Sequence, residues 1–183
     1  TFPWEEWDII REDGPVGTAD AGENTGFNSG DLDQPFYYIS AEPTQAMLVG
    51  EMTLSMTELE ASVGADPQSI FGSMAVDFDT GTAQGSIFFD SAVGQATYEW
   101  FLEFSGQVDG ASLAATLGGE SSVSSFQNES SFALDGNVAG IFTGDGGQTP
   151  VGMTGGFSAE AVGSDMEAYG VFVMEETNLE EPN

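Results

Sequence analysis

Carboxylates are the main side chains in this sequence that could do chemistry. Asp and Glu number 31 against a single cation, Arg11, and the formal net charge is −30 over 183 residues, with no His and no Cys. Carboxylates bind hard cations, and a close pair can act as the acid and base of a glycosidase. Among so many acids, however, close pairs arise by chance, and the serine-rich stretch 121–131 has no histidine to activate a nucleophile. The sequence therefore predicts a protein that is not an enzyme.

Calcium is the one cofactor for which the sequence offers candidate ligands. The usual ligands of structural zinc and of haem are missing, because the chain has neither His nor Cys. Ca²⁺ takes about six to eight oxygen ligands, which converging aspartates can supply. Aspartate is also a common turn residue, and that alternative is open at each position. The candidate metal ligands are Asp77 and Asp79, Asp31 and Asp33, and Asp145.

The charge also limits the partners. A chain this acidic repels nucleic acid and anionic membrane surfaces, and no apolar run approaches the ~18–20 residues that span a bilayer as a helix. Its self-repulsion is screened only when the Debye length falls to about 3–10 Å, which indicates a saline setting or bound cations. We expect an extracellular or outer-surface protein from a salt-rich environment. The alternative is the cytoplasm of a salt-accumulating cell.

Hydrophobic periodicity divides the chain into three segments. Residues 1–33 form an arm that is rich in aromatic residues, Gly and Asp; residues 34–174 alternate with a period of two; and residues 175–183 form an acidic tail. About eight successive strands joined by short turns predict an all-β, eight-stranded antiparallel up-and-down barrel, whose closure removes both sheet edges. The predicted inward face mixes Gly and Ala with Phe, Trp and Met, which favours a packed interior.

Local signals within the barrel segment predict its turns. Asp-Gly type sequences at 79–81, 109–110, 135–136 and 145–147 are typical of hairpin connections. One short helix is predicted over residues 57–63.

Glycine and phenylalanine recur together near the ends of the later predicted strands. The sequence reads VAGIFTG at 138–144, GGFSA at 155–159 and GVF at 170–172, after MAVDFDTGTAQG at 74–85. This pattern resembles transferrin-binding-protein-B-like β-barrels, which also occur in haemophores, in factor-H-binding-type lipoproteins and at the ends of some FecR-domain surface proteins. The resemblance implies an eight-stranded barrel with a small sheet beside it, exported to the outer surface of a Gram-negative bacterium. It also implies binding rather than catalysis.

Aromatic residues on the predicted outer face are the candidate interface. Phe71, Phe88 and Phe101 fall at outward positions of neighbouring strands, and clustered apolar surface usually marks a contact. Three alternatives are open: the arm folds back over them with Trp4 and Trp7, another subunit covers them, or they are exposed without a partner. The same alternatives apply to three outward residues of the last strand, Tyr169, Val171 and Val173.

Two functions are compatible with these features. The favoured hypothesis is a structural module that self-associates, as in a filament, layer or matrix, with cation-dependent contacts between copies of the chain. The alternative is an extracellular binding module for another surface protein or a small solute, related to iron or haem uptake by the family resemblance.

Overall fold

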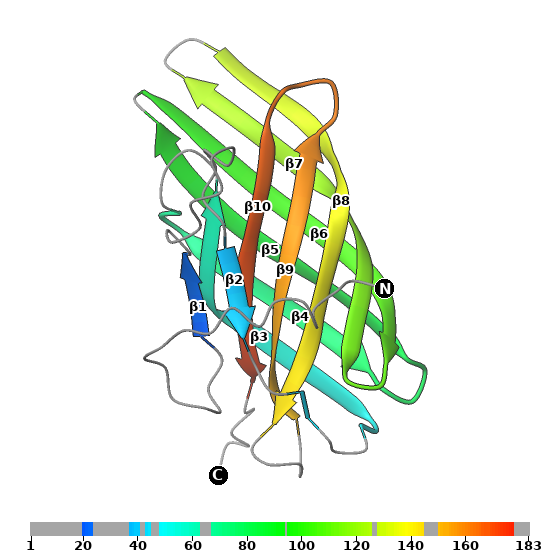
Figure 1. Ribbon diagram of the computed structural model, residues 1–183. Coiled ribbons are helices and arrows are strands. Elements are labelled where there is room, and N and C mark those ends of the chain that lie inside the picture. The colour runs from blue at the N-terminus through cyan, green and yellow to red at the C-terminus, as the bar shows by residue number, and fades with distance from the viewer. Residues whose placement is uncertain are drawn as a thin grey trace, which may run out of the picture.

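The computed structural model describes residues 20–23, 37–40, 43–44, 48–62, 67–93, 95–125, 128–144 and 150–177. Eight antiparallel strands close into a barrel in the order β10-β3-β4-β5-β6-β7-β8-β9 (Figure 1). The barrel strands are β3 (Glu51–Ser62), β4 (Ile70–Asp77), β5 (Thr82–Val93), β6 (Ala96–Asp109), β7 (Ser112–Ser125), β8 (Asn128–Gly144), β9 (Pro150–Ala161) and β10 (Glu167–Glu176). The predicted all-β up-and-down barrel is confirmed.

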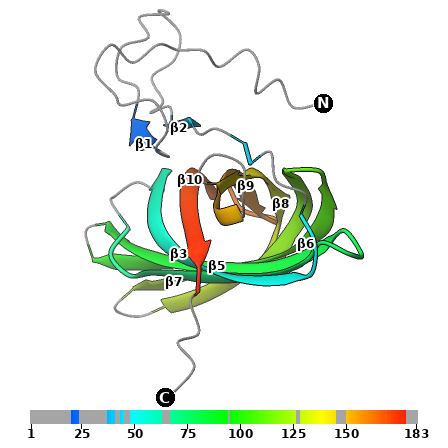
Figure 2. The ribbon, with the colours of Figure 1, turned by 90° about the horizontal axis from the view of Figure 1, so that it is seen from below.

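A second, two-stranded sheet lies outside the barrel. It pairs β1 (Asp20–Glu23) with β2 (Tyr37–Ser40) in antiparallel register. Figure 2 shows both strands outside the ring of barrel strands, on the side of β3 and β10. Pro43 and Thr44 lie against β8 of the barrel: Pro43 forms a β-bridge with Thr143, and the backbone N–H of Thr44 donates to the Phe142 carbonyl over 2.8 Å. Trp4 and Trp7 lie outside the described residues.

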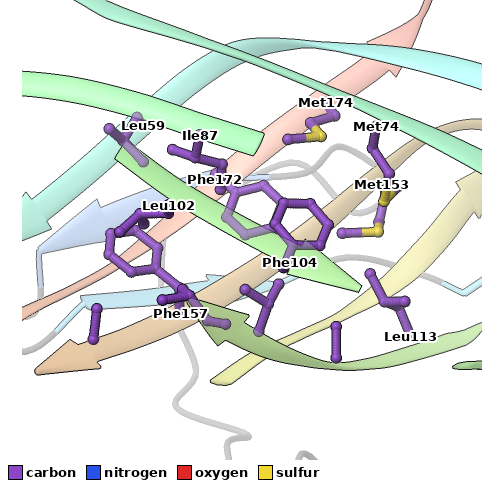
Figure 3. Packing of buried hydrophobic residues seen from close by; sticks show 14 of the residues in the cluster. Leu59, Met74, Ile87, Leu102, Phe104, Leu113, Met153, Phe157, Phe172 and Met174 are labelled. Atoms are coloured by element: carbon purple, nitrogen blue, oxygen red, sulfur yellow. The ribbon is translucent and has the colours of Figure 1, made fainter. Parts of the chain in front are cut away.

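The barrel interior is filled by apolar side chains. Phe89 stacks with Trp100 at a centroid distance of 6.1 Å and meets Phe157 at 5.7 Å. Figure 3 shows side chains from several strands pointing into this one space. The largest fully buried apolar side chains are Trp100, Phe89, Phe142, Phe172, Leu54, Met74, Ile87, Leu102, Met153, Met174 and Val138. The packed interior predicted from the sequence is therefore present.

Large inward residues are accommodated by glycines on neighbouring strands. Gly85 lies opposite Phe104 in the β5–β6 register. A Cβ at Gly85 would come within 2.5 Å of Phe104 Cζ and 2.6 Å of the Ser73 carbonyl oxygen. At Gly155 a Cβ would come within 2.8 Å of Phe172 Cζ. The ring of each phenylalanine thus occupies the volume that a side chain on the glycine would need.

A β-bulge in β3 explains why a helix was predicted there. In the pairing with β10, Val173 lies opposite Glu58 and Met174 opposite Met56, so Thr57 is the extra residue. The bulge changes the inward parity, because Leu54 is buried before it and Leu59 after it. The period-two pattern is broken at this point and imitates a helical spacing. The prediction of a helix over 57–63 is wrong, because residues 57–62 belong to β3.

Two of the predicted turns are confirmed and one is wrong. Gly81 and Gly110 have positive φ values of 67° and 57° and lie in the β4–β5 and β6–β7 connections. Residues 135–136 instead continue β8, which pairs with β9 on both sides of Gly136. A side chain at Gly136 would clash with the Ser158 carbonyl oxygen, so this glycine permits close strand approach and makes no turn. Residues 145–149 lie outside the described part of the chain.

Gly85→Ala should destabilise the barrel by about 1–3 kcal/mol, because the new methyl group overpacks the site beside Phe104. Chemical denaturation measures this difference. Gly118→Ala is the matched control, since the nearest atom to its Cβ would be 3.9 Å away. Equal effects of the two substitutions would contradict the assignment of Gly85 as a packing glycine.

Candidate binding surface

Three phenylalanines form a row across the outer wall of the barrel. Phe71 of β4 lies opposite Phe88 of β5, and Phe88 lies opposite Phe101 of β6. The rings of Phe71 and Phe88 stack with centroids 4.6 Å apart and an interplanar angle of 20°. Phe71 is 57% exposed and Phe101 is 40% exposed. We call these residues the aromatic row. The register therefore brings together the three outward phenylalanines that the sequence singled out.

Carboxylates surround the Phe101 end of the aromatic row. Glu99 and Glu103 share the outer face of β6 with Phe101, and Glu120 of β7 lies opposite Phe101 in register. The Ser122 hydroxyl donates to Glu99 Oε2 over 2.9 Å. The Ser131 hydroxyl donates to Glu120 in the same way. These hydrogen bonds favour particular positions of two of the three carboxylates.

Sequence reasoning found part of the acidic border and missed Glu120. Period-two alternation places Glu99 and Glu103 on the outer face, two positions from Phe101. Glu120 is 19 positions away in the chain and becomes a neighbour only through the β6–β7 register. That register depends on where the hairpin turns, and Gly110 in the turn was the available signal.

An open hollow lies beside the aromatic row. It measures about 750 Å³ and is bordered by Phe101 and Glu103, with Ser73, Gln84 and Ser105 on its surface. A second hollow of about 600 Å³ adjoins it and shares Ala75, Gln84 and Ser105. The side chains of these shared positions are short apart from Gln84. Together the two hollows form a shallow channel over β3–β7, which we call the outer groove.

The second predicted interface is a covered surface. Val171 is 5% exposed and Thr154, on the same outer face, is 1% exposed; Tyr169 and Val173 are partly buried. The β1–β2 sheet contacts this wall through β3, β9 and β10. The outward residues of the last strand therefore pack within the molecule, whereas Phe71 and Phe101 remain exposed.

Two of the candidate metal ligands are engaged in a turn. Asp77 Oδ1 accepts hydrogen bonds from the backbone N–H groups of Asp79 and Thr80 over 2.9 and 3.1 Å. Asp79 Oδ1 accepts from the backbone N–H of Gly50 over 3.1 Å. No group of three or more metal-ligating side chains gathers anywhere in the described ranges. Asp31, Asp33 and Asp145 lie outside those ranges, so calcium binding there stays a prediction.

Buried polar atoms inside the barrel form the remaining unusual feature. Trp100 Nε1 and Ser121 Oγ are buried without a hydrogen-bond partner, and the two residues lie opposite each other in the β6–β7 register. An unpaired buried hydroxyl destabilises a fold, because it has lost its hydrogen bonds to water.

Comparisons with known proteins support the fold class. No family model matches the sequence, and no curated protein matches it. The barrel is a transferrin-binding-protein-B-like barrel, as the glycine and phenylalanine pattern predicted. One similar solved structure is a mutant of the vaccine antigen Transferrin Binding Protein B from Haemophilus parasuis Hp5, with a TM-score of 0.50 and 17% sequence identity. The match covers 77% of this chain and 30% of that chain, so this chain corresponds to less than a third of that protein. At this identity the likeness establishes the fold alone.

No helix capable of crossing a bilayer occurs in the part of the chain that the structure describes.

Acid unfolding should depend on Asp77. The Thr80 hydroxyl, together with the backbone N–H groups of Thr80 and Asp79, lowers the pKa of Asp77 below its usual 3.8. The ionised form therefore contributes stability that is complete above pH 3.8 and is lost as the pH falls through the lowered folded-state pKa. Asp77→Asn should flatten the fall of the melting temperature over that acid range, as followed by circular dichroism. Glu160→Gln removes one charge elsewhere on the barrel and should leave the slope nearly unchanged. A slope unaltered by Asp77→Asn would contradict this account.

Ser121→Ala should leave the free energy of unfolding unchanged or raise it by up to about 1 kcal/mol, because it removes an unpaired buried hydroxyl. Urea denaturation provides the measurement. Ser122→Ala is the neighbouring control and should be slightly destabilising, because it breaks the hydrogen bond to Glu99. A clear destabilisation by Ser121→Ala would show that its hydroxyl has a partner in solution.

Proposed function

We propose that this chain is a non-catalytic binding module that acts outside the cell or at the cell surface. In this proposal the aromatic row on the barrel wall contacts another protein. The observation that carries the proposal is the exposure of Phe71 and Phe101 on a barrel whose interior is filled. Exposed clusters of aromatic side chains are typical of protein contacts. Burying an aromatic ring removes a large apolar surface from water, and the rigid side chain loses little conformational entropy.

The filled interior argues against a small-solute carrier of the lipocalin type. Aromatic and methionine side chains occupy the centre of the barrel. The binding chemistry is therefore assigned to the outer wall. The similar solved structure is named as a transferrin-binding protein and a vaccine antigen, which supports an extracellular protein partner in general. Iron or haem handling is part of the family resemblance and remains a prediction.

Self-association is the second candidate, and the exposed aromatic row is also the observation that favours it. Two copies would have to approach with a formal charge of −30 each. Such repulsion is weakened only in high salt or by bound cations, which is why a salt-rich setting belongs to this proposal.

Site-specific photo-cross-linking tests the binding function. Benzoylphenylalanine in place of Phe71 should cross-link the protein to a different protein in cultures of the producing organism. Benzoylphenylalanine in place of Asp165, an exposed residue of the β9–β10 connection, should not form that product. Cross-links at position 71 to copies of the same chain alone would show that self-association is the function of the aromatic row. Absence of any cross-link specific to position 71 would overturn both proposals.

Light scattering separates the two candidates independently. A heterologous binding module should remain at 19.1 kDa in low salt, in molar salt and with millimolar Ca²⁺. Assemblies that form in salt or Ca²⁺ and dissociate in the Phe71→Ser/Phe101→Ser variant would favour self-association.

A further inference from the structure

We propose that the occupant of the outer groove is an extended, basic segment of the partner protein, which places a cationic or apolar side chain on the aromatic row. This inference rests on the proposed binding function and adds the chemistry of the partner. Three properties of the wall support it: its shape, its charge and its available contacts.

The outer groove has the shape of a channel for an extended chain. Its two hollows adjoin along β4, β5 and β6 and share a surface of mostly short side chains, Ala75, Gln84 and Ser105. One hollow reaches Phe101 at the aromatic row. The other reaches Glu51, the first residue of β3, and Asp77, the last residue of β4. A compact ligand would fill one hollow, whereas an extended polypeptide can occupy both.

The charges that border the groove are all acidic. Glu103 borders the first hollow, and Glu51 and Asp77 border the second. Hydrogen bonding lowers the pKa of Asp77, so this carboxylate keeps its negative charge down to low pH. Arg11, the single Arg or Lys of the chain, lies outside the described residues. A basic segment would therefore be attracted along the whole groove, while nucleic acid and a second copy of this acidic chain would be repelled.

The aromatic row adds a preference within basic segments. The stacked rings of Phe71 and Phe88, with Phe101 beside them, provide π surfaces, and Glu99 and Glu120 stand next to Phe101. Arginine combines a planar cation that stacks on aromatic rings with donors that pair with carboxylates. An arginine-bearing segment with a nearby apolar residue therefore fits both components of this surface.

Main-chain pairing does not provide an alternative along the groove. Residues 73–77 of β4, 82–86 of β5 and 101–107 of β6 are paired on both sides, so this part of the wall offers no strand edge to which a partner could add a strand. Recognition at this wall must come from side chains, and the side chains present are aromatic, acidic and short polar groups.

Selection from a random dodecapeptide display library tests the inference at about 150 mM salt, where diffuse attraction is screened beyond roughly 8 Å. The wild-type chain is the bait, and Phe71→Ser/Phe101→Ser is used for counter-selection. Both substituted residues are exposed, so the variant should fold, and its circular dichroism and melting temperature verify this. We expect the peptides that depend on the aromatic row to be rich in arginine with an adjacent apolar residue.

The outcomes distinguish the two levels of the proposal. Neutral or acidic peptides that still depend on the aromatic row would overturn the basic-segment inference and leave the binding function standing. Failure to recover any peptide that depends on the aromatic row would count against both.

Charge-matched variants then test the groove itself with one synthetic peptide from the selection. Glu103→Gln should weaken its binding roughly tenfold, as expected for loss of a close charge pair at an interface. Glu160→Gln, on β9 and away from the groove lining, should change it by less than about twofold, because it alters only the diffuse field. Equal losses for the two variants would mean that the peptide responds to net charge alone, and would overturn the assignment of the groove.

Discussion

The structure depends on closure of one sheet by pairing of β10 with β3. Closure gives each barrel strand a neighbour on both sides and encloses a space that side chains must fill. The glycines opposite Phe104 and Phe172 are needed because both rings share that space with their neighbours. The bulge at Thr57 belongs to the same requirement, since it adjusts inward parity at the seam where the first and last strands meet. Since the inner face is used for packing, the accessible side chains of the barrel lie on its outer wall.

The outer wall of the barrel is mostly polar and acidic, with one exposed cluster of aromatic side chains. Short polar and acidic side chains keep the outer surface of β3–β7 hydrated, and the aromatic row interrupts it at a single level of β4, β5 and β6. The outward apolar residues of β10, Val171 and its neighbours, are covered by contacts within the chain. The outward apolar residues of β10 are thus buried within the chain, whereas the wall of β4, β5 and β6 leaves the rings of Phe71 and Phe101 exposed.

The sequence was sufficient for the architecture because period-two alternation is a local property. It placed Leu54, Met74 and Trp100 inside, and it placed the three phenylalanines outside on neighbouring strands. The sequence-based prediction failed where tertiary contacts override local signals.

The Asp-Gly pair at 135–136 is typical of a turn, yet Gly136 lies within β8, where the lack of a side chain allows β9 to approach closely. The bulge at Thr57 and the acidic border formed by Glu120 depend on pairing between distant segments, which no local pattern contains. Aspartates 77 and 79 were recognised as chemically capable, but only the geometry shows that backbone N–H groups occupy them.

The buried methionines give the barrel a chemical consequence of its own. Met74, Met153 and Met174 are almost completely enclosed, and the chain has no cysteine. Peroxide attacks exposed sulfur, so these three thioethers are shielded for as long as the barrel stays closed. Sulfoxide formation at these positions would then proceed only during opening of the structure, and its rate would report how often the barrel opens. The packing that fills the barrel thereby also protects it against oxidative ageing.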